Sequence, residues 1–134
     1  MEIDFKEISP RERYKLLSST VIPRPIALVS STGPDGVDNA APYSFFNVFS
    51  EDPPLLILGL QNKEDGSSKD TARNIMDTGE FVVNLIDRQM AEAINNCAVD
   101  FPPEVSEFEV TGLKRAPCKM IDVKRIAEAP VALE

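Results

Sequence analysis

The sequence predicts a mainly β fold with peripheral helices, in the form of a Greek-key antiparallel barrel. Gly33-Pro34-Asp35-Gly36 predicts a turn between strands at 26–31 and 37–40, because proline fixes φ and glycine supplies positive φ. Strands joined by such a short turn pair antiparallel. No strand is followed by a G-x-G-x-x-G loop, so a doubly wound nucleotide-binding sheet has no support.

Length and charge narrow the class of protein. A chain of 134 residues predicts one domain, 1–134, that can bury about two thirds of its unfolded surface. The net charge of −8 argues against nucleic acid, because a phosphate backbone needs a basic face. No apolar run approaches the ~20 residues of a membrane span, and the charged start MEIDFKEIS does not resemble a secretory leader. We therefore expect a cytoplasmic protein with no membrane partner.

The chain contains no histidine. This excludes Cys/His zinc sites, Ser-His-Asp triads and Cys-His dyads. Cys97 and Cys118 are the two cysteines and do not form a C-x-x-C pair, so we interpret them as small apolar residues of a reduced protein. No catalytic residue and no metal ligand is predicted.

Near the N-terminus, Ser9-Pro10-Arg11-Glu12 predicts a helix start, with Ser9 as the N-cap and Glu12 completing a capping box. We expect this helix to run to about residue 17 or 18 and to bury Tyr14 and Leu17. Arg24 then lies between two prolines in extended backbone. Its guanidinium suits a phosphate or carboxylate, although a solvated arginine in a linker explains the pattern as well.

Residues 43–50 alternate as a strand does, yet both faces carry aromatic side chains. Two interpretations stay open: a barrel strand buried on both sides, or a strand with the core on one side and a ligand or partner subunit on the other. Asp52-Pro53-Pro54 ends this strand. The apolar run 55–60 predicts a second strand, covered on both faces.

After a polar loop at 61–66, residues 67–71 open a helix that extends to about Thr78, with Gly79 at its end. Ser67 and Asp70 have the spacing of a capping box, which explains these residues without a ligand. Free N–H groups, hydroxyls and Lys69 at a helix start can also bind a phosphate. Pattern alone leaves both interpretations open.

The C-terminal half continues with alternating elements. We expect a strand at 80–85, a helix at 88–98 capped by Asp87, an acidic connector at 104–112, and short strands at 113–116 and 120–123. The apolar face of the helix is expected to consist of Met90, Ala91, Ile94 and Ala98.

Five segments together resemble a known family. They are TVIPRPIALVSS, DNAAPYSFFNVFSEDPPLLIL, DGSSKDTARNI, GEFVVNL and RIAEAPVALE. In this order and at these distances, from about Tyr14 to Glu134, they resemble the flavin reductase-like family with the FMN-binding split barrel, including flavoredoxin-type proteins.

The resemblance implies a split barrel that forms a homodimer and binds FMN near the subunit interface. By their place in the motifs, the residues expected at the isoalloxazine and ribityl parts are Ser44, Phe45, Phe46 and Asn47. Those expected at the phosphate are Arg24, Ser67, Ser68, Lys69 and Thr71. The implied activity is an oxidoreductase that moves reducing equivalents from NAD(P)H or another reduced carrier through FMN to an acceptor.

The family continues beyond the point that corresponds to Glu134, so we expect this chain to lack the C-terminal strands of the barrel. Two other functions are consistent with the same motifs. One is a flavin carrier or storage module without turnover, and the other is a flavin-free dimeric interaction domain.

Overall fold

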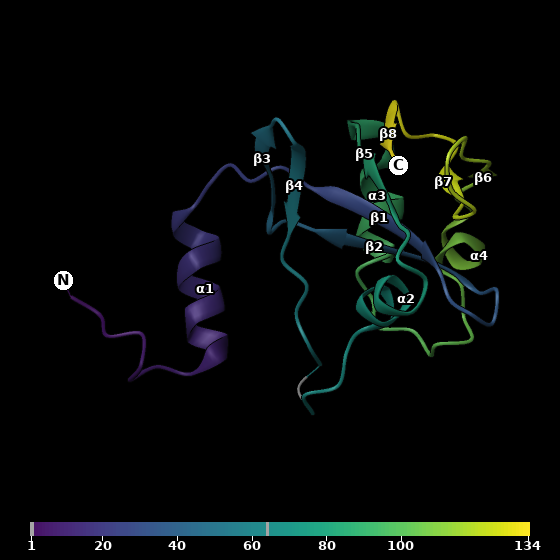
Figure 1. Ribbon diagram of the computed structural model, residues 1–134. Coiled ribbons are helices and arrows are strands. Elements are labelled where there is room, and N and C mark those ends of the chain that lie inside the picture. Colours follow the sequence, from purple (N-terminus) through teal and green to yellow (C-terminus); the bar gives the residue numbers. More distant parts are fainter. Residues whose placement is uncertain (1, 64) are drawn as a thin grey trace.

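The computed structural model describes residues 2–63 and 65–134, and its centre is a four-stranded antiparallel sheet in the order β2-β1-β5-β8 (Figure 1). These strands are β1 (Ala27–Thr32), β2 (Asp38–Tyr43), β5 (Val82–Leu85) and β8 (Val131–Leu133). Two smaller sheets pair β3 (Phe46–Glu51) with β4 (Pro54–Leu58), and β6 (Arg115–Ala116) with β7 (Arg125–Ile126). The predicted antiparallel pairing is confirmed. The described residues form three separate sheets, and closure into a Greek-key barrel stays a prediction.

Helical segments surround these sheets, as predicted. They are α1 (Pro10–Thr20), α2 (Asp70–Thr78), the 3₁₀ turn η1 (Arg88–Met90), α3 (Ala91–Asn96) and α4 (Glu107–Thr111). The acidic stretch 104–112, expected as a connector, thus contains the short helix α4. The predicted strand at 120–123 is wrong, because the chain bends there and the next strand is β7.

The β1–β2 hairpin forms as predicted. The N–H of Gly36 donates to the carbonyl of Gly33 at 2.9 Å, and Gly36 has a φ of 82°, which favours glycine. Strand β2 continues through Pro42, which lies opposite Leu28. Because β2 is an edge strand of the sheet, it can contain Pro42 although proline has no backbone N–H to donate.

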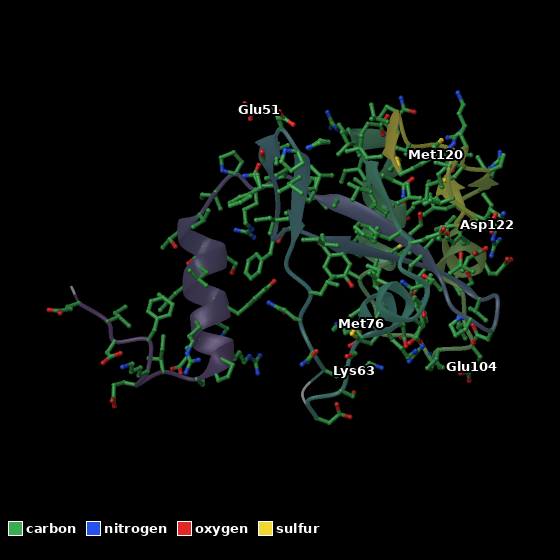
Figure 2. All side chains as sticks on the ribbon, in the orientation of Figure 1. Glu51, Lys63, Met76, Glu104, Met120 and Asp122 are labelled. Atoms are coloured by element: carbon green, nitrogen blue, oxygen red, sulfur yellow. The ribbon has the colours of Figure 1, made fainter. Side chains whose placement is uncertain are left out.

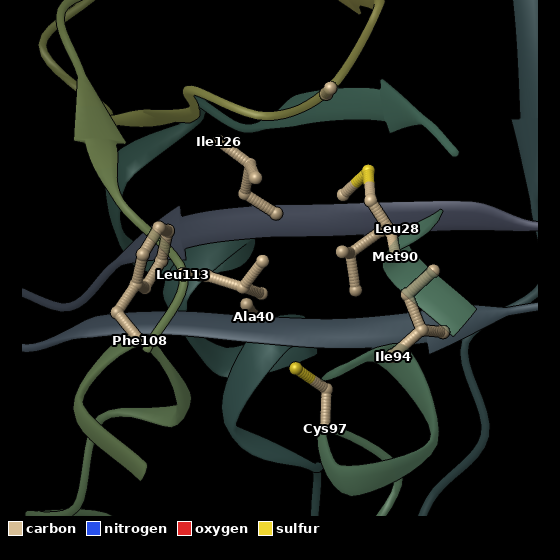
Figure 3. Close-up of a cluster of buried hydrophobic side chains, with 9 residues drawn as sticks. Leu28, Ala40, Met90, Ile94, Cys97, Phe108, Leu113 and Ile126 are labelled. Carbon is tan, nitrogen blue, oxygen red and sulfur yellow. The ribbon is translucent and has the colours of Figure 1, made fainter. Parts of the chain in front are cut away.

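Both faces of the central sheet are covered. Leu28 of β1 contributes to one cluster, which also contains Phe108 of α4, and Figure 3 shows this cluster between the sheet and the helices. Ala27 and Val29 point the other way, into a cluster with Phe46 of β3. This alternation follows the period of two in a strand. Strand β1 is therefore packed against other elements on both faces of the sheet.

The helix at 88–98 begins at Asp87, whose carboxylate accepts from the N–H groups of Gln89 and Met90. Its predicted apolar face is partly wrong. Met90 and Ile94 are buried together with Cys97, whereas Ala91 and Ala98 are exposed. The 3₁₀ turn η1 precedes α3 and has three residues per turn, which shifts the phase of the buried face relative to one continuous α-helix.

Helix α1 has the predicted capping box, in which Ser9 and Glu12 each bond to the other's backbone N–H. The expectation that Tyr14 and Leu17 are buried is wrong: they are 46% and 41% exposed, and α1 contains no buried residue. In Figure 1 the helix stands apart from the central sheet, beyond the β3–β4 hairpin. The rest of the described chain therefore leaves the apolar side of α1 largely exposed.

The β3–β4 hairpin also differs from the prediction. A bend at 44–45 separates β2 from β3, so residues 43–50 do not form one continuous strand. Leu55, Leu56 and Ile57 of β4 are exposed, which makes the expected cover on both faces wrong for the described residues. The pair forms its own two-stranded sheet, in which Phe46 is buried in the core and Leu58, opposite it, packs partly against the same cluster.

Candidate functional site

A cleft of about 280 Å³ opens where three parts of the chain meet. The end of β2 and the bend after it form one wall, the start of α2 forms a second, and residues 97–101 after α3 form a third. Gln61 and Lys63 line it from the loop after β4, and Tyr14 lines it from α1. Figure 2 shows Lys63 on this loop, below the hairpin.

Part of the predicted set of binding residues comes together here. Ser44 and Phe45 line the cleft from the bend after β2, and Lys69 and Thr71 line it from the start of α2. Arg24 lies behind this wall and donates from Nε to the hydroxyl of Ser44 at 3.2 Å. Two segments that are distant in sequence therefore meet at one cleft.

The remaining predicted residues lie outside the lining. Phe46 is buried in the core, and Asn47 is exposed, with its side-chain oxygen accepting from the N–H of Val48. Ser67 donates from its hydroxyl to Asp65 at 2.6 Å, and Ser68 forms a bridge with Asn62. The two serines thus organise the loop before α2.

The start of α2 differs from a capping box. Ser67 bonds to Asp65, while Asp70 pairs with Arg73 at 2.8 Å, so the predicted Ser67–Asp70 box is wrong. Lys69 occupies the N-cap position, and in the part of the chain that the structure describes no side chain caps this first turn. Uncapped N–H groups at a helix start favour an anion. The Lys69 ammonium lies 3.1 Å from the carboxylate of Asp100.

The floor of the cleft is a buried polar network that the sequence analysis missed. Thr71 is 1% exposed and accepts from the amide of Asn39 at 2.8 Å. Burial raises the pKa of Tyr43, although a hydrogen bond with Thr71 opposes this. The period of two in β2 could have revealed these residues, because Asn39 and Tyr43 share one face and Ala40 occupies the other.

Glu107 is a further lining residue that the sequence analysis did not single out. It is 7% exposed, and its carboxylate accepts from the N–H of Ala40 at 3.0 Å. Burial raises the pKa of this carboxyl group. A buried carboxyl in a cleft is typical of functional sites. In this protein the carboxylate of Glu107 also holds α4 to the edge of the sheet.

The residues of the cleft fit an aromatic ligand that carries an anionic group. Tyr14 and Phe45 provide aromatic rings, while Lys63, Lys69 and the start of α2 provide positive charge. The lining also contains three acidic groups: Asp100 and Asp70 are paired with Lys69 and Arg73, and the carboxyl of Glu107 accepts from the N–H of Ala40. Among residues 2–63 and 65–134, no group of three or more acidic, cysteine or histidine side chains is placed to hold a metal ion. No described helix has the length and apolar character needed to span a membrane.

Comparison with known proteins identifies the family. The model of the flavin reductase like domain matches residues 18–134. A protein of uncharacterised function from Halalkalibacterium halodurans is 44% identical over 134 residues, which is all of this chain and 64% of that protein. The chain therefore belongs to the flavin reductase-like family, as the sequence motifs predicted.

Two solved structures are similar along nearly the whole chain. They are the 2-nitrobenzoate 2-nitroreductase of Pseudomonas fluorescens, with 41% identity and a TM-score of 0.86, and nitrilotriacetate monooxygenase component B of Bacillus cereus, with 40% identity and a TM-score of 0.93. Each alignment covers 98% of this chain, but 62% and 65% of the respective solved chain. Flavoredoxins and a flavin reductase with a split barrel domain, at 18–20% identity, share the fold alone. The chain thus spans somewhat less than two thirds of these two solved relatives.

Proposed function

We propose that this chain is the FMN-binding part of an oxidoreductase that transfers reducing equivalents from NAD(P)H or another reduced carrier to an acceptor. Family membership supports a flavin-related redox function in general. The observation that carries the proposal for this chain is the meeting of Ser44 and Phe45 with Lys69 and Thr71 at one cleft. Aromatic and hydroxyl groups on one wall suit a flavin ring, and positive charge on the opposite wall suits its phosphate.

The proposed binding residues are those that the sequence motifs predicted, and four of them, Ser44, Phe45, Lys69 and Thr71, line the cleft. The ring and ribityl parts are assigned to Ser44, Phe45, Phe46 and Asn47. The phosphate is assigned to Arg24, Ser67, Ser68, Lys69 and Thr71. A bound flavin supplies the electron-transfer chemistry itself, while the protein binds, orients and shields it. The buried bond from Asn39 to Thr71 holds the Thr71 hydroxyl in place at the end of the cleft.

We also propose that the protein works as a cytoplasmic homodimer. The apolar surface of the β3–β4 hairpin supports this, because Val48 and Phe49 are 67% and 71% exposed. For the acceptor of the electrons we propose only a chemical class. The names of the two solved relatives point to a nitroaromatic compound or an oxygenase partner.

A visible absorption spectrum tests the proposal. The purified protein is mixed separately with FMN, FAD and riboflavin, and unbound flavin is removed. We expect bands near ~450 and ~375 nm to remain with FMN, the signature of the cofactor that carries the chemistry. Oxidation of NADH and NADPH by the loaded protein is then followed at saturating flavin.

Each other outcome selects a different function. Retained flavin without nicotinamide oxidation would indicate a flavin carrier or storage module. Retention of FAD but not FMN would contradict the choice of cofactor. A colourless dimer would contradict the proposal and favour a flavin-free interaction domain.

A further inference from the structure

Arg24 connects two parts of the molecule. It lies between Pro23 and Pro25, in the segment that joins α1 to β1. Its Nη1 donates to the carbonyl of Val21 at 2.7 Å and also to the carbonyl of Ser18, both at the C-terminal end of α1. Its Nε donates in another direction, to the hydroxyl of Ser44. The guanidinium therefore joins the end of α1 to the wall of the cleft.

Few other contacts hold α1 in place. The helix has no buried residue, and its clearest contact with the rest of the chain is made by Tyr14. The Tyr14 ring lies 5.8 Å from that of Phe45, centroid to centroid, with the ring planes tilted by 44°. Such a separation is within the range of a stabilising aromatic pair. The Arg24 guanidinium carbon also lies 6.0 Å from the Phe45 centroid.

Helix α1 and the bend after β2, which Arg24 joins, both contribute side chains to the cleft. Tyr14, Ser44 and Phe45 all line it, whereas Arg24 does not. We propose that Arg24 is a positioning residue that holds α1 so that the Tyr14 ring contacts the aromatic part of the bound flavin. This inference rests on the proposed function, since it names a further contact in the same cleft.

An arginine suits this position for a physical reason. Its planar guanidinium donates in several fixed directions from three nitrogens, whereas the three donors of a lysine ammonium share one nitrogen and rotate freely. The flanking prolines restrict the backbone, so the side chain starts from a constrained position. Within the described residues Nη2 has no hydrogen-bond partner, so one pair of N–H donors stays available. Binding of the flavin phosphate by Arg24 and the positioning of α1 are therefore two alternative roles, and they predict different results.

The chain contains no tryptophan, so Tyr14→Trp introduces a single fluorescent indole at the cleft. We expect FMN to quench this indole, and its anisotropy in the free protein to report how firmly α1 is held. Adding Arg24→Gln is expected to lower that anisotropy before any ligand is present. Arg11→Gln, on the exposed surface of the same helix, is the matched control and should leave it unchanged.

Flavin affinity separates positioning from direct phosphate binding. Loss of charge-assisted hydrogen bonds in Arg24→Gln is expected to weaken flavin binding on the order of tenfold. If Arg24 positions Tyr14, riboflavin and FMN lose affinity by the same factor, because riboflavin lacks only the phosphate. A loss for FMN alone would assign Arg24 to the phosphate and overturn the inference.

A double variant provides a second test. If both residues act through one contact, Tyr14→Leu combined with Arg24→Gln loses little more affinity than either change alone. Fully additive losses, or unchanged anisotropy in Arg24→Gln, would overturn the inference. Circular dichroism checks that each variant is folded. If Tyr14→Trp and the unmodified protein both fail to bind any flavin, the proposed function fails, while the anisotropy still tests the link between Arg24 and α1.

Discussion

The carboxylate of Glu107 accepts a hydrogen bond from the backbone N–H of Ala40 at 3.0 Å. Ala40 belongs to the edge strand β2, and Glu107 is the first residue of α4. The hydroxyl of Ser106 donates to the carbonyl of Asp38, two residues earlier on the same strand. Helix α4 therefore occupies part of the edge at which another strand could pair.

The burial of Glu107 predicts that the stability of the fold depends on pH, and the hydrogen bond from Ala40 opposes this effect. Burial raises the pKa of Glu107 in the folded protein, so folding favours the protonated form. Below the pKa of about 4.3 that Glu has in the unfolded chain, the protonated Glu107 contributes fully to stability. This contribution is lost as the pH rises through the pKa of the folded state. Glu107→Gln keeps an oxygen that can accept from Ala40 but cannot ionise. We expect its stability, relative to the unmodified protein, to increase between pH 4 and pH 8.

Urea unfolding across this pH range measures the difference. Glu104→Gln, at an exposed position, controls for the removal of one negative charge. If the two variants show the same pH dependence, the buried carboxyl does not contribute as described.

Phe108 is the largest side chain of the core that is almost fully buried, at 1% exposure. Phe108→Ala is expected to lower the free energy of unfolding by about 3–5 kcal/mol, since it removes apolar contacts and leaves a cavity. Val110→Ala changes a 49% exposed residue of the same helix and should cost no more than about 0.5 kcal/mol. Denaturant unfolding of both variants measures these values, and equal losses would contradict the assignment of Phe108 to the core.

Lys69 lies at the start of α2, where we propose the flavin phosphate binds. Lys69→Gln should weaken FMN binding roughly tenfold, because a charge-assisted contact is lost. Riboflavin binding should stay the same, and Lys124→Gln, at an exposed position far along the chain, should affect neither. Flavin fluorescence titrations measure these affinities. An equal loss for riboflavin would place Lys69 away from the phosphate.

The two cysteines are expected to differ in reactivity. Cys97 is 3% exposed, and burial raises the pKa of its thiol to about 11. Cys118 is partly exposed. Since the thiolate is the reactive form, iodoacetamide at pH 7.5 should modify Cys118 well before Cys97. Mass spectrometry of peptides follows both sites, and unfolding in urea should remove the difference. Faster modification of Cys97 in the folded protein would show that α3 does not protect it.

Short residue patterns correctly predicted those features that depend only on neighbouring residues. The capping box of Ser9 and Glu12, the cap at Asp87 and the left-handed Gly79 each involve residues within one helical turn. The same reasoning failed at Ser67, because Asp65 is closer in sequence and takes its hydroxyl instead. Competing local partners cannot be ranked from spacing alone.

Burial was harder to predict because it depends on distant parts of the chain. Tyr14 and Leu55 have the residue types of core positions, yet both are exposed in the described chain. Glu107 has the type of a surface residue and is buried. In each case the outcome depends on whether another element covers the residue, which hydrophobic periodicity does not specify.

Residue patterns alone predicted the β1–β2 hairpin, the cap of α1 at Ser9 and the end of α2 at Gly79, because these follow from local backbone preferences. The series of motifs predicted the flavin reductase-like family. Only the tertiary structure decided which side chains face the cleft. Tyr14 and Glu107 reach it from α1 and α4, and Arg24 bonds to Ser44 behind its wall. Such neighbours are brought together by packing between distant elements, and no rule of local spacing determines that packing.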